Sequence, residues 1–74
     1  MEDRLVEILG DVFDLEPEEI SVDLTPDDVP LWDSLNHLKL ITAVEEVYGI
    51  QFSMADVQAI NSIEKLQSAI AANA

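Results

Sequence analysis

Residues 31–49 read LWDSLNHLKLITAVEEVYG, and this stretch carries the strongest pattern in the 74-residue chain. Apolar residues recur at helical spacing after Ser34, so the pattern predicts a helix over residues 34–48. Gly49 follows as a residue that readily takes the left-handed conformation in which many helices end. The stretch therefore places one serine, preceded by an acid, at the start of an amphipathic helix.

The helix predicted over residues 34–48 has apolar side chains on two sides. At about 100° per residue, one side gathers an inner stripe: Leu40, Ile41, Val44, Val47 and Tyr48, with His37 among them. The other side gathers an outer stripe: Leu35, Leu38 and Thr42, next to Lys39, Glu45 and Glu46. One stripe has to face the interior of the protein. The other fits either a partner surface or a place under the preceding loop, and the residues alone leave both interpretations open.

Three further helices are predicted around this one. Residues 3–14 repeat apolar side chains at helical spacing, and a capping box from Ser53 to Asp56 opens a short helix over residues 55–60. Asn61 or Ser62 caps a last helix over residues 62–72. We therefore predict an all-α fold, a small four-helix bundle with three main helices and one short helix, in a single domain over residues 1–74. Its expected core contains Leu5, Leu9, Val12, Leu40, Val44, Ile60, Ile63 and Leu66.

Residues 15–33 form a long connection between the first two helices. Glu16–Glu19 and Thr25–Asp28 each contain a proline followed by acids, which predicts one helical turn in each. Pro30 prevents a longer helix. Apolar residues are spaced so as to hold the loop on the core: Ile20, Leu24, Val29 and Leu31. A close neighbour is also expected at Gly10, inside the first helix.

The charge is strongly negative, with 16 acidic against 3 basic residues and a formal net charge of −13. This excludes nucleic acid and anionic membrane surfaces as partners and favours proteins with basic docking patches. A solubilising role for the acids is the competing interpretation. No apolar run reaches membrane-spanning length, and Met1–Arg4 lacks the features of a signal peptide, so we expect a cytoplasmic monomer. There is no cysteine.

The residues offer little for catalysis or metal binding. Ser34 lacks the flanking glycines of a nucleophile elbow, and His37 is the only histidine available as an acid or base. The acids between Asp23 and Asp28 do not form a calcium loop, because Asp28 stands at the glycine position and Ser34 replaces the closing glutamate. We therefore predict no catalytic residues, no metal ligands and no enzyme activity.

Asp33-Ser34-Leu35, followed by Leu38, Leu40, Ala43-Val44-Glu45-Glu46 and Phe52, resembles the attachment motif and second helix of acyl carrier proteins. The resemblance extends over nearly the whole chain. It implies that a phosphopantetheinyl transferase joins 4′-phosphopantetheine, taken from coenzyme A, to the hydroxyl of Ser34. It also implies that Asp33 helps the transferase and its metal to engage the site. Acyl groups would then be carried as thioesters on the cofactor thiol.

The resemblance also gives the outer stripe a role. It implies that Leu35, Leu38, Thr42 and Glu46, with Lys39 beside them, dock acyl-loading and acyl-transferring enzymes. Asn36 and Lys39 stand where carriers of fatty-acid synthesis commonly have acids, Met54–Ala59 is nearly neutral, and Trp32 is less typical of that group. These departures favour a specialised natural-product or polysaccharide pathway over fatty-acid-like biosynthesis. A peptidyl or aminoacyl carrier and an unmodified acidic interaction module remain as alternatives.

Overall fold

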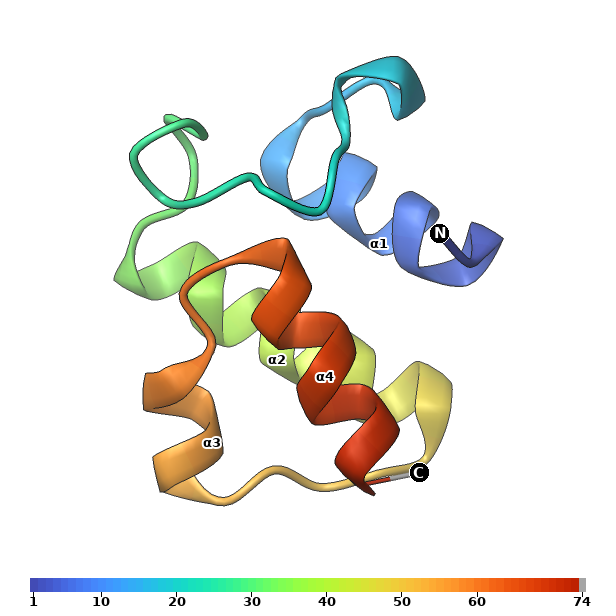
Figure 1. The fold of residues 1–74 in the computed structure, drawn as a ribbon, viewed down its shortest axis with the longest axis vertical. Coiled ribbons are helices and arrows are strands. Elements are labelled where there is room, and N and C mark those ends of the chain that lie inside the picture. The colour runs from blue at the N-terminus through green and yellow to red at the C-terminus, as the bar shows by residue number, and fades with distance from the viewer. Residues whose placement is uncertain (74) are drawn as a thin grey trace.

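The computed structural model describes residues 1–73, and these residues form an all-α fold without strands (Figure 1). Four α-helices are present, α1 (Asp3–Phe13), α2 (Ser34–Tyr48), α3 (Met54–Ala59) and α4 (Ile63–Asn73), together with a 3₁₀ turn, η1 (Pro17–Glu19). The predicted four-helix fold is confirmed. The bounds of α2 agree with the prediction, and those of the other three helices differ by one residue at one or both ends.

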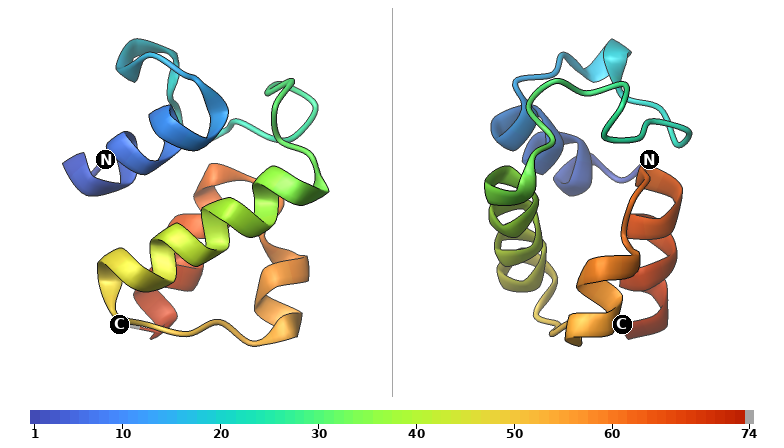
Figure 2. Two further views of the ribbon diagram at one scale, coloured as in Figure 1. Left: turned by 180° about the vertical axis from the view of Figure 1, so that it is seen from behind. Right: turned by 90° about the vertical axis from the view of Figure 1, so that its left-hand side faces the viewer.

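The helices enclose one core between them. Figure 2 shows α2 and α4 facing each other, with α3 beside the N-terminal half of α2. α1 runs along α2 in the opposite direction, since Arg4 lies over Tyr48 at the end of α2 and Phe13 stacks on Trp32 just before its start. The inner stripe supplies Leu40 and Val44, both fully buried, and α4 supplies Ile63 and Leu66. The buried cluster is completed by Leu5, Ile8, Leu9, Phe13, Val29, Trp32, Ile41 and Ile60. Burying side chains of this kind is the main source of stability in a domain without disulfides.

Two residues within the helices are less buried than predicted. Val12 is only partly buried and packs against the core from its edge. Val47, assigned to the inner stripe, is exposed and lines a hollow between α1 and α2 together with Ile8, Val12 and Ala43. Both side chains line this open hollow, so helical spacing alone overestimates their burial.

The long loop is held on the bundle at several points. Val29 is buried, and the amides of Ile63 and Glu64 at the start of α4 donate to the carbonyls of Leu24 (3.0 Å) and Val22 (2.9 Å). These bonds use amides that a helix start leaves without intrahelical partners. The loop is therefore an integral part of the fold, as its apolar residues predict.

The two short turns predicted in the loop have different outcomes. Glu16 and Glu19 form a capping box around η1, so the first helical turn is confirmed. At Thr25–Asp28 the chain makes a hydrogen-bonded turn without helix, so the second prediction is wrong. The Asp28 carboxylate accepts from both the amide and the hydroxyl of Thr25, at 3.1 Å each. Asp and Thr side chains often favour such local bonds over helix.

The prediction that Leu31 is buried is wrong, and its neighbour Trp32 is buried instead. Leu31, expected to pin the loop, is 43% exposed, whereas Trp32 is only 6% exposed and stacks on Phe13 with ring centroids 5.1 Å apart. The larger aromatic side chain buries more apolar area than a leucine would.

The two glycines have the roles that the sequence suggests. A Cβ added at Gly10 would lie 3.0 Å from the carbonyl oxygen of Leu15, so the expected close neighbour is the backbone after α1. Gly49 ends α2 in the left-handed conformation, with φ of 65°. No helix within residues 1–73 has the length and apolar character needed to cross a membrane.

Candidate functional site

Ser34 is the first residue of α2, and its side chain is exposed. The preceding residue, Asp33, is the N-cap: its carboxylate accepts a hydrogen bond from the amide of Asn36 at 2.8 Å. Within residues 1–73 the Ser34 hydroxyl makes no hydrogen bond. Ser53 and Ser62 differ, because their hydroxyls accept from the amides of Asp56 and Lys65 at 3.1 Å each. Capping at α2 is thus done by an acid, and the serine hydroxyl is left available.

The turn before Ser34 is fixed by backbone and side-chain bonds. The amides of Trp32 and Asp33 donate to the carbonyls of Val29 and Leu31, both at 3.0 Å. The side-chain amide of Asn36 donates to the same Leu31 carbonyl at 2.7 Å. Asn36 therefore binds the turn from the first turn of α2. Ser34 lies between this hydrogen-bonded turn and the helix, and both restrain its backbone. In the sequence alone, Asn36 stands out only as a departure from an acidic pattern.

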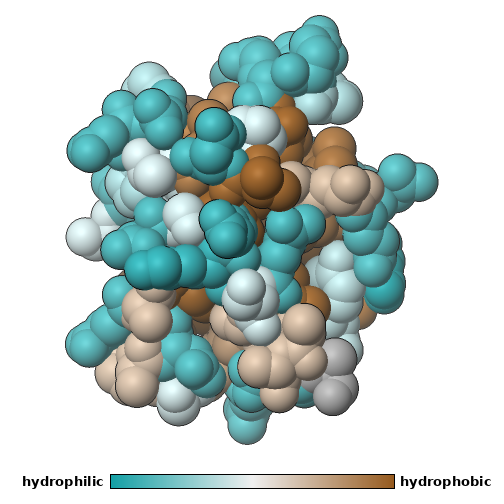
Figure 3. All heavy atoms as spheres, viewed as in Figure 1, coloured by the Kyte–Doolittle hydropathy of each residue, from teal (hydrophilic) through white to brown (hydrophobic). Residues whose placement is uncertain are grey.

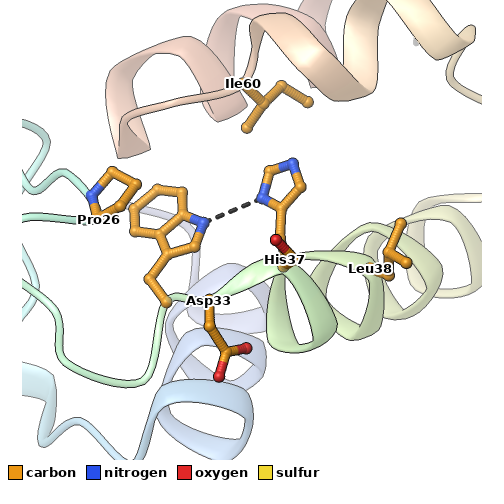
Figure 4. Close-up of a pocket in the computed structure, with 7 residues that line it drawn as sticks. Pro26, Asp33, His37, Leu38 and Ile60 are labelled. Carbon is orange, nitrogen blue, oxygen red and sulfur yellow. Dashed lines mark hydrogen bonds between the residues drawn. The ribbon is translucent and has the colours of Figure 1, made fainter.

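An open cleft of about 470 Å³ borders Ser34. Its lining comes from the loop, the start of α2 and the residue after α3: Pro26, Trp32, Asp33, Ser34, His37, Leu38 and Ile60. In Figure 4 the imidazole of His37 and the side chain of Ile60 face each other, whereas the carboxylate of Asp33 points away from them. The serine thus lies at the edge of a mainly apolar hollow, with its hydroxyl accessible to a large group.

His37 uses both ring nitrogens. Its Nδ1 accepts a hydrogen bond from the indole N–H of Trp32 at 3.0 Å, drawn as a dashed line in Figure 4. Its Nε2 lies 2.9 Å from the carbonyl oxygen of Val57 in α3. A carbonyl can only accept, so Nε2 carries the proton and donates. Neither nitrogen is left to take a proton from Ser34 in this arrangement.

The outer stripe of α2 is open to solvent. Leu35 is 65% exposed and Leu38 is 56% exposed, so the interpretation that they pack under the loop is wrong. They line a shallow hollow of about 340 Å³ with Lys39, Thr42, Ala43 and Glu46. The structure thus brings together all five residues expected to dock partners. Glu45 turns away from this hollow, and its carboxylate accepts from the amide of Phe52 at 2.8 Å.

The acidic side chains are spread over the surface. In the view of Figure 3, hydrophilic residues cover much of the molecule and hydrophobic ones show between them. No group of three or more histidine or carboxylate side chains within residues 1–73 is placed to hold a metal ion.

The lone arginine, Arg4, is engaged locally: it binds Glu2 and lies 4.5 Å from the ring centroid of Tyr48. The bond from Arg4 lowers the pKa of the Glu2 carboxyl.

A small acidic helical fold that presents an exposed serine at the start of its second helix has the form of a carrier domain. The family model described as the phosphopantetheine attachment site matches residues 3–70. The chain therefore belongs to this family, that of the acyl carrier proteins. No curated protein matches the chain.

Membership of the family establishes what the domain carries. It is the site of covalently attached 4′-phosphopantetheine, and the chain is a phosphopantetheine-carrying carrier protein. Carriers of this family work with a phosphopantetheinyl transferase and with enzymes that handle acyl groups. The geometry fits such a group, because the Ser34 hydroxyl is exposed, makes no hydrogen bond within residues 1–73 and lies next to an open cleft.

Proposed function

We propose that Ser34 is the residue to which 4′-phosphopantetheine is attached, and that the protein carries acyl intermediates for a specialised natural-product or polysaccharide pathway. The main supporting observation is that helix capping and cofactor attachment fall to different residues at the start of α2. Asp33 caps the helix through its carboxylate, so modification of the Ser34 hydroxyl removes no bond from the fold. A serine that capped its own helix would lose its acceptor function on esterification, at a cost of about 1 kcal/mol.

The attachment reaction assigns a role to each residue of the pair. The oxygen of Ser34 forms an ester bond with the phosphorus of the pantetheine arm. The hydroxyl proton leaves to a base of the transferase, and the nucleotide portion of coenzyme A departs with its own phosphate. Asp33 uses Oδ1 for the cap, and its exposed carboxylate keeps Oδ2 for the transferase and its metal. Once attached, the cofactor supplies the thiol that this cysteine-free chain lacks.

The outer stripe is the docking face in this proposal. Leu35 and Leu38 offer exposed apolar contacts, and Thr42 and Glu46 border the same hollow. Partners with basic patches are attracted by the net charge of −13, which also opposes self-association and favours a monomer. Lys39 interrupts the acidic character of the face and would select partners that offer an acid opposite it. Single-domain organisation and a cytoplasmic location stay predictions.

Intact-mass measurement after co-expression with a broad-specificity phosphopantetheinyl transferase tests the proposal. We expect the mass to rise by one phosphopantetheine, with the added group on Ser34. An unchanged mass would instead favour the unmodified acidic interaction module. If the loaded protein takes aminoacyl groups rather than acyl groups from purified loading enzymes, it is a peptidyl or aminoacyl carrier.

A further inference from the structure

A chain of contacts runs from α1 to α3 past the start of α2. The ring of Phe13 in α1 stacks on Trp32, and Trp32 in turn lies 6.2 Å from the ring of His37, at an interplanar angle of 19°. The indole N–H binds His37 Nδ1, and His37 Nε2 binds the carbonyl of Val57. Three segments that are distant in the sequence are thus joined through Trp32 and His37, which both line the cleft that borders Ser34.

α3 has few other attachments. It is six residues long and contains no buried residue; Val57 is half-buried. The last carbonyls of a helix have no partner within the helix, and the Val57 carbonyl finds one in the imidazole of His37. A short helix held by so little apolar burial depends strongly on each such bond.

The bonding pattern admits only one form of the imidazole. Nδ1 must be unprotonated to accept from the indole, and Nε2 must be protonated to donate to a carbonyl. A second proton on Nδ1 removes the acceptor and sets two N–H donors against each other. The neutral form with the proton on Nε2 is therefore the one that joins Trp32 to Val57.

We propose that His37 is a positioning residue for the reactions at Ser34: in its neutral form it fixes α3 and the Trp32 turn on either side of the serine, and its protonation releases them. The part that concerns the reactions rests on the proposed function of Ser34. The part that concerns α3 rests only on the contacts of His37. Enzymes that approach Ser34 meet the turn, the start of α2 and α3 together, so their relative placement affects recognition.

Most titratable groups of the elements around the imidazole are exposed. Asp33 is the only other titratable residue lining the cleft, and in Figure 4 its carboxylate points away from His37. The only one in α3 is Asp56, whose carboxylate accepts from the amide of Ser53. In the elements packed alongside, Asp14 after α1 and Glu64 and Lys65 in α4 are exposed. Asp27 and Asp28, beside Pro26, are exposed as well.

The chain offers a clean test because it contains one tryptophan and one histidine. Amide exchange of α3, expressed as protection factors, and the emission of Trp32 are followed from about pH 8 to about pH 5, the range in which histidine changes charge. His37→Ala removes both bonds. His37→Gln keeps a donor and an acceptor but does not ionise in this range. Gln58→Ala changes an exposed position of α3 outside the contact chain and serves as the matched control.

We expect nitrogen NMR of the wild type at pH 7.5 to show the proton on Nε2. In His37→Ala the protection of α3 falls about tenfold, as for the loss of one to two hydrogen bonds, while His37→Gln and Gln58→Ala keep most of it. Acidification lowers protection and changes Trp32 emission in the wild type but not in His37→Gln. A proton on Nδ1, equal protection in wild type and His37→Ala, or the same pH response in His37→Gln would overturn the proposal.

Phosphopantetheine transfer onto the full chain then tests the positioning role. For one transferase we expect His37→Ala to raise KM several-fold with a smaller effect on kcat, and His37→Gln to restore KM. Transfer rates of the wild type and His37→Gln are compared at each pH, because their ratio cancels the pH dependence of the enzyme itself. We expect the ratio of wild-type to His37→Gln rates to fall on acidification. Unchanged KM despite a loosened α3 refutes the positioning role. A wild type that accepts no cofactor refutes the proposed function and the positioning role with it, while the exchange data still decide whether His37 holds α3.

Discussion

The two apolar stripes of α2 lie in opposite surroundings although both are rich in leucine and other aliphatic residues. Leu40 of the inner stripe is fully buried against α1 and α4, while Leu38, two residues earlier, is 56% exposed. In a chain of 74 residues every apolar side chain left in water is one that the core does not use. The two stripes of one helix therefore have different roles: the inner stripe stabilises the fold, and the outer stripe is open for contacts with another molecule.

The largest expected effect on stability is at the inner stripe. Leu40→Ala leaves a cavity at a fully buried position and should lower the free energy of unfolding by about 2–5 kcal/mol. This is a large share of the stability of so small a domain. Chemical denaturation of the variant and the wild type measures it. A loss below about 1 kcal/mol would mean that α2 is not the centre of the core.

Leu38→Ala, the matched change on the outer stripe, should barely move the melting temperature, because the side chain already meets water. If the outer stripe docks partners, the change removes a partner contact instead, and we expect acyl loading by a purified enzyme to slow roughly threefold to tenfold. Val22→Ala, another exposed apolar position away from α2, is the control for nonspecific effects. Equal loading rates for Leu38→Ala and the wild type would remove the outer stripe from the docking face.

Lys39→Glu should have the smallest effect on folding, within about 0.5 kcal/mol, because the position is exposed. It makes the face uniformly acidic, so turnover with enzymes of fatty-acid synthesis should improve. Because long-range attraction weakens as salt shortens the Debye length below about 10 Å, that gain should shrink at high salt. A gain that does not change with salt would show that Lys39 acts by contact rather than by charge.

Much of the helical framework could be predicted because the signals that start, continue and end a helix are local in the sequence. Gly49, the capping box at Ser53 and the spacing of Leu40 and Val44 all act within a few residues. The loop was harder, since it has no periodicity to tell which of two apolar neighbours faces inward. Trp32 is buried and Leu31 is not because Trp32 can stack on Phe13, a residue 19 positions away in the chain.

The candidate site was predictable to a different degree. Ser34 and Asp33 stood out through the resemblance of the motif, and the family match over residues 3–70 supports that resemblance. That Asp33 rather than Ser34 caps α2 could not be read from the sequence, because both residue types are good caps. The bonds from His37 to Trp32 and to Val57 also required the fold, since Val57 lies 20 residues further along the chain.

Site-localised mass spectrometry of the wild type and Ser34→Ala decides whether 4′-phosphopantetheine is attached at Ser34. Both proteins are incubated with a transferase and coenzyme A, and Ser53→Ala and Ser62→Ala serve as controls that lose a helix cap, worth about 1 kcal/mol each, but keep the attachment residue. We expect one cofactor on Ser34 in the wild type and both controls, and none on a normally folded Ser34→Ala. A cofactor on another serine, or a modified Ser34→Ala, would rule out Ser34 as the attachment residue.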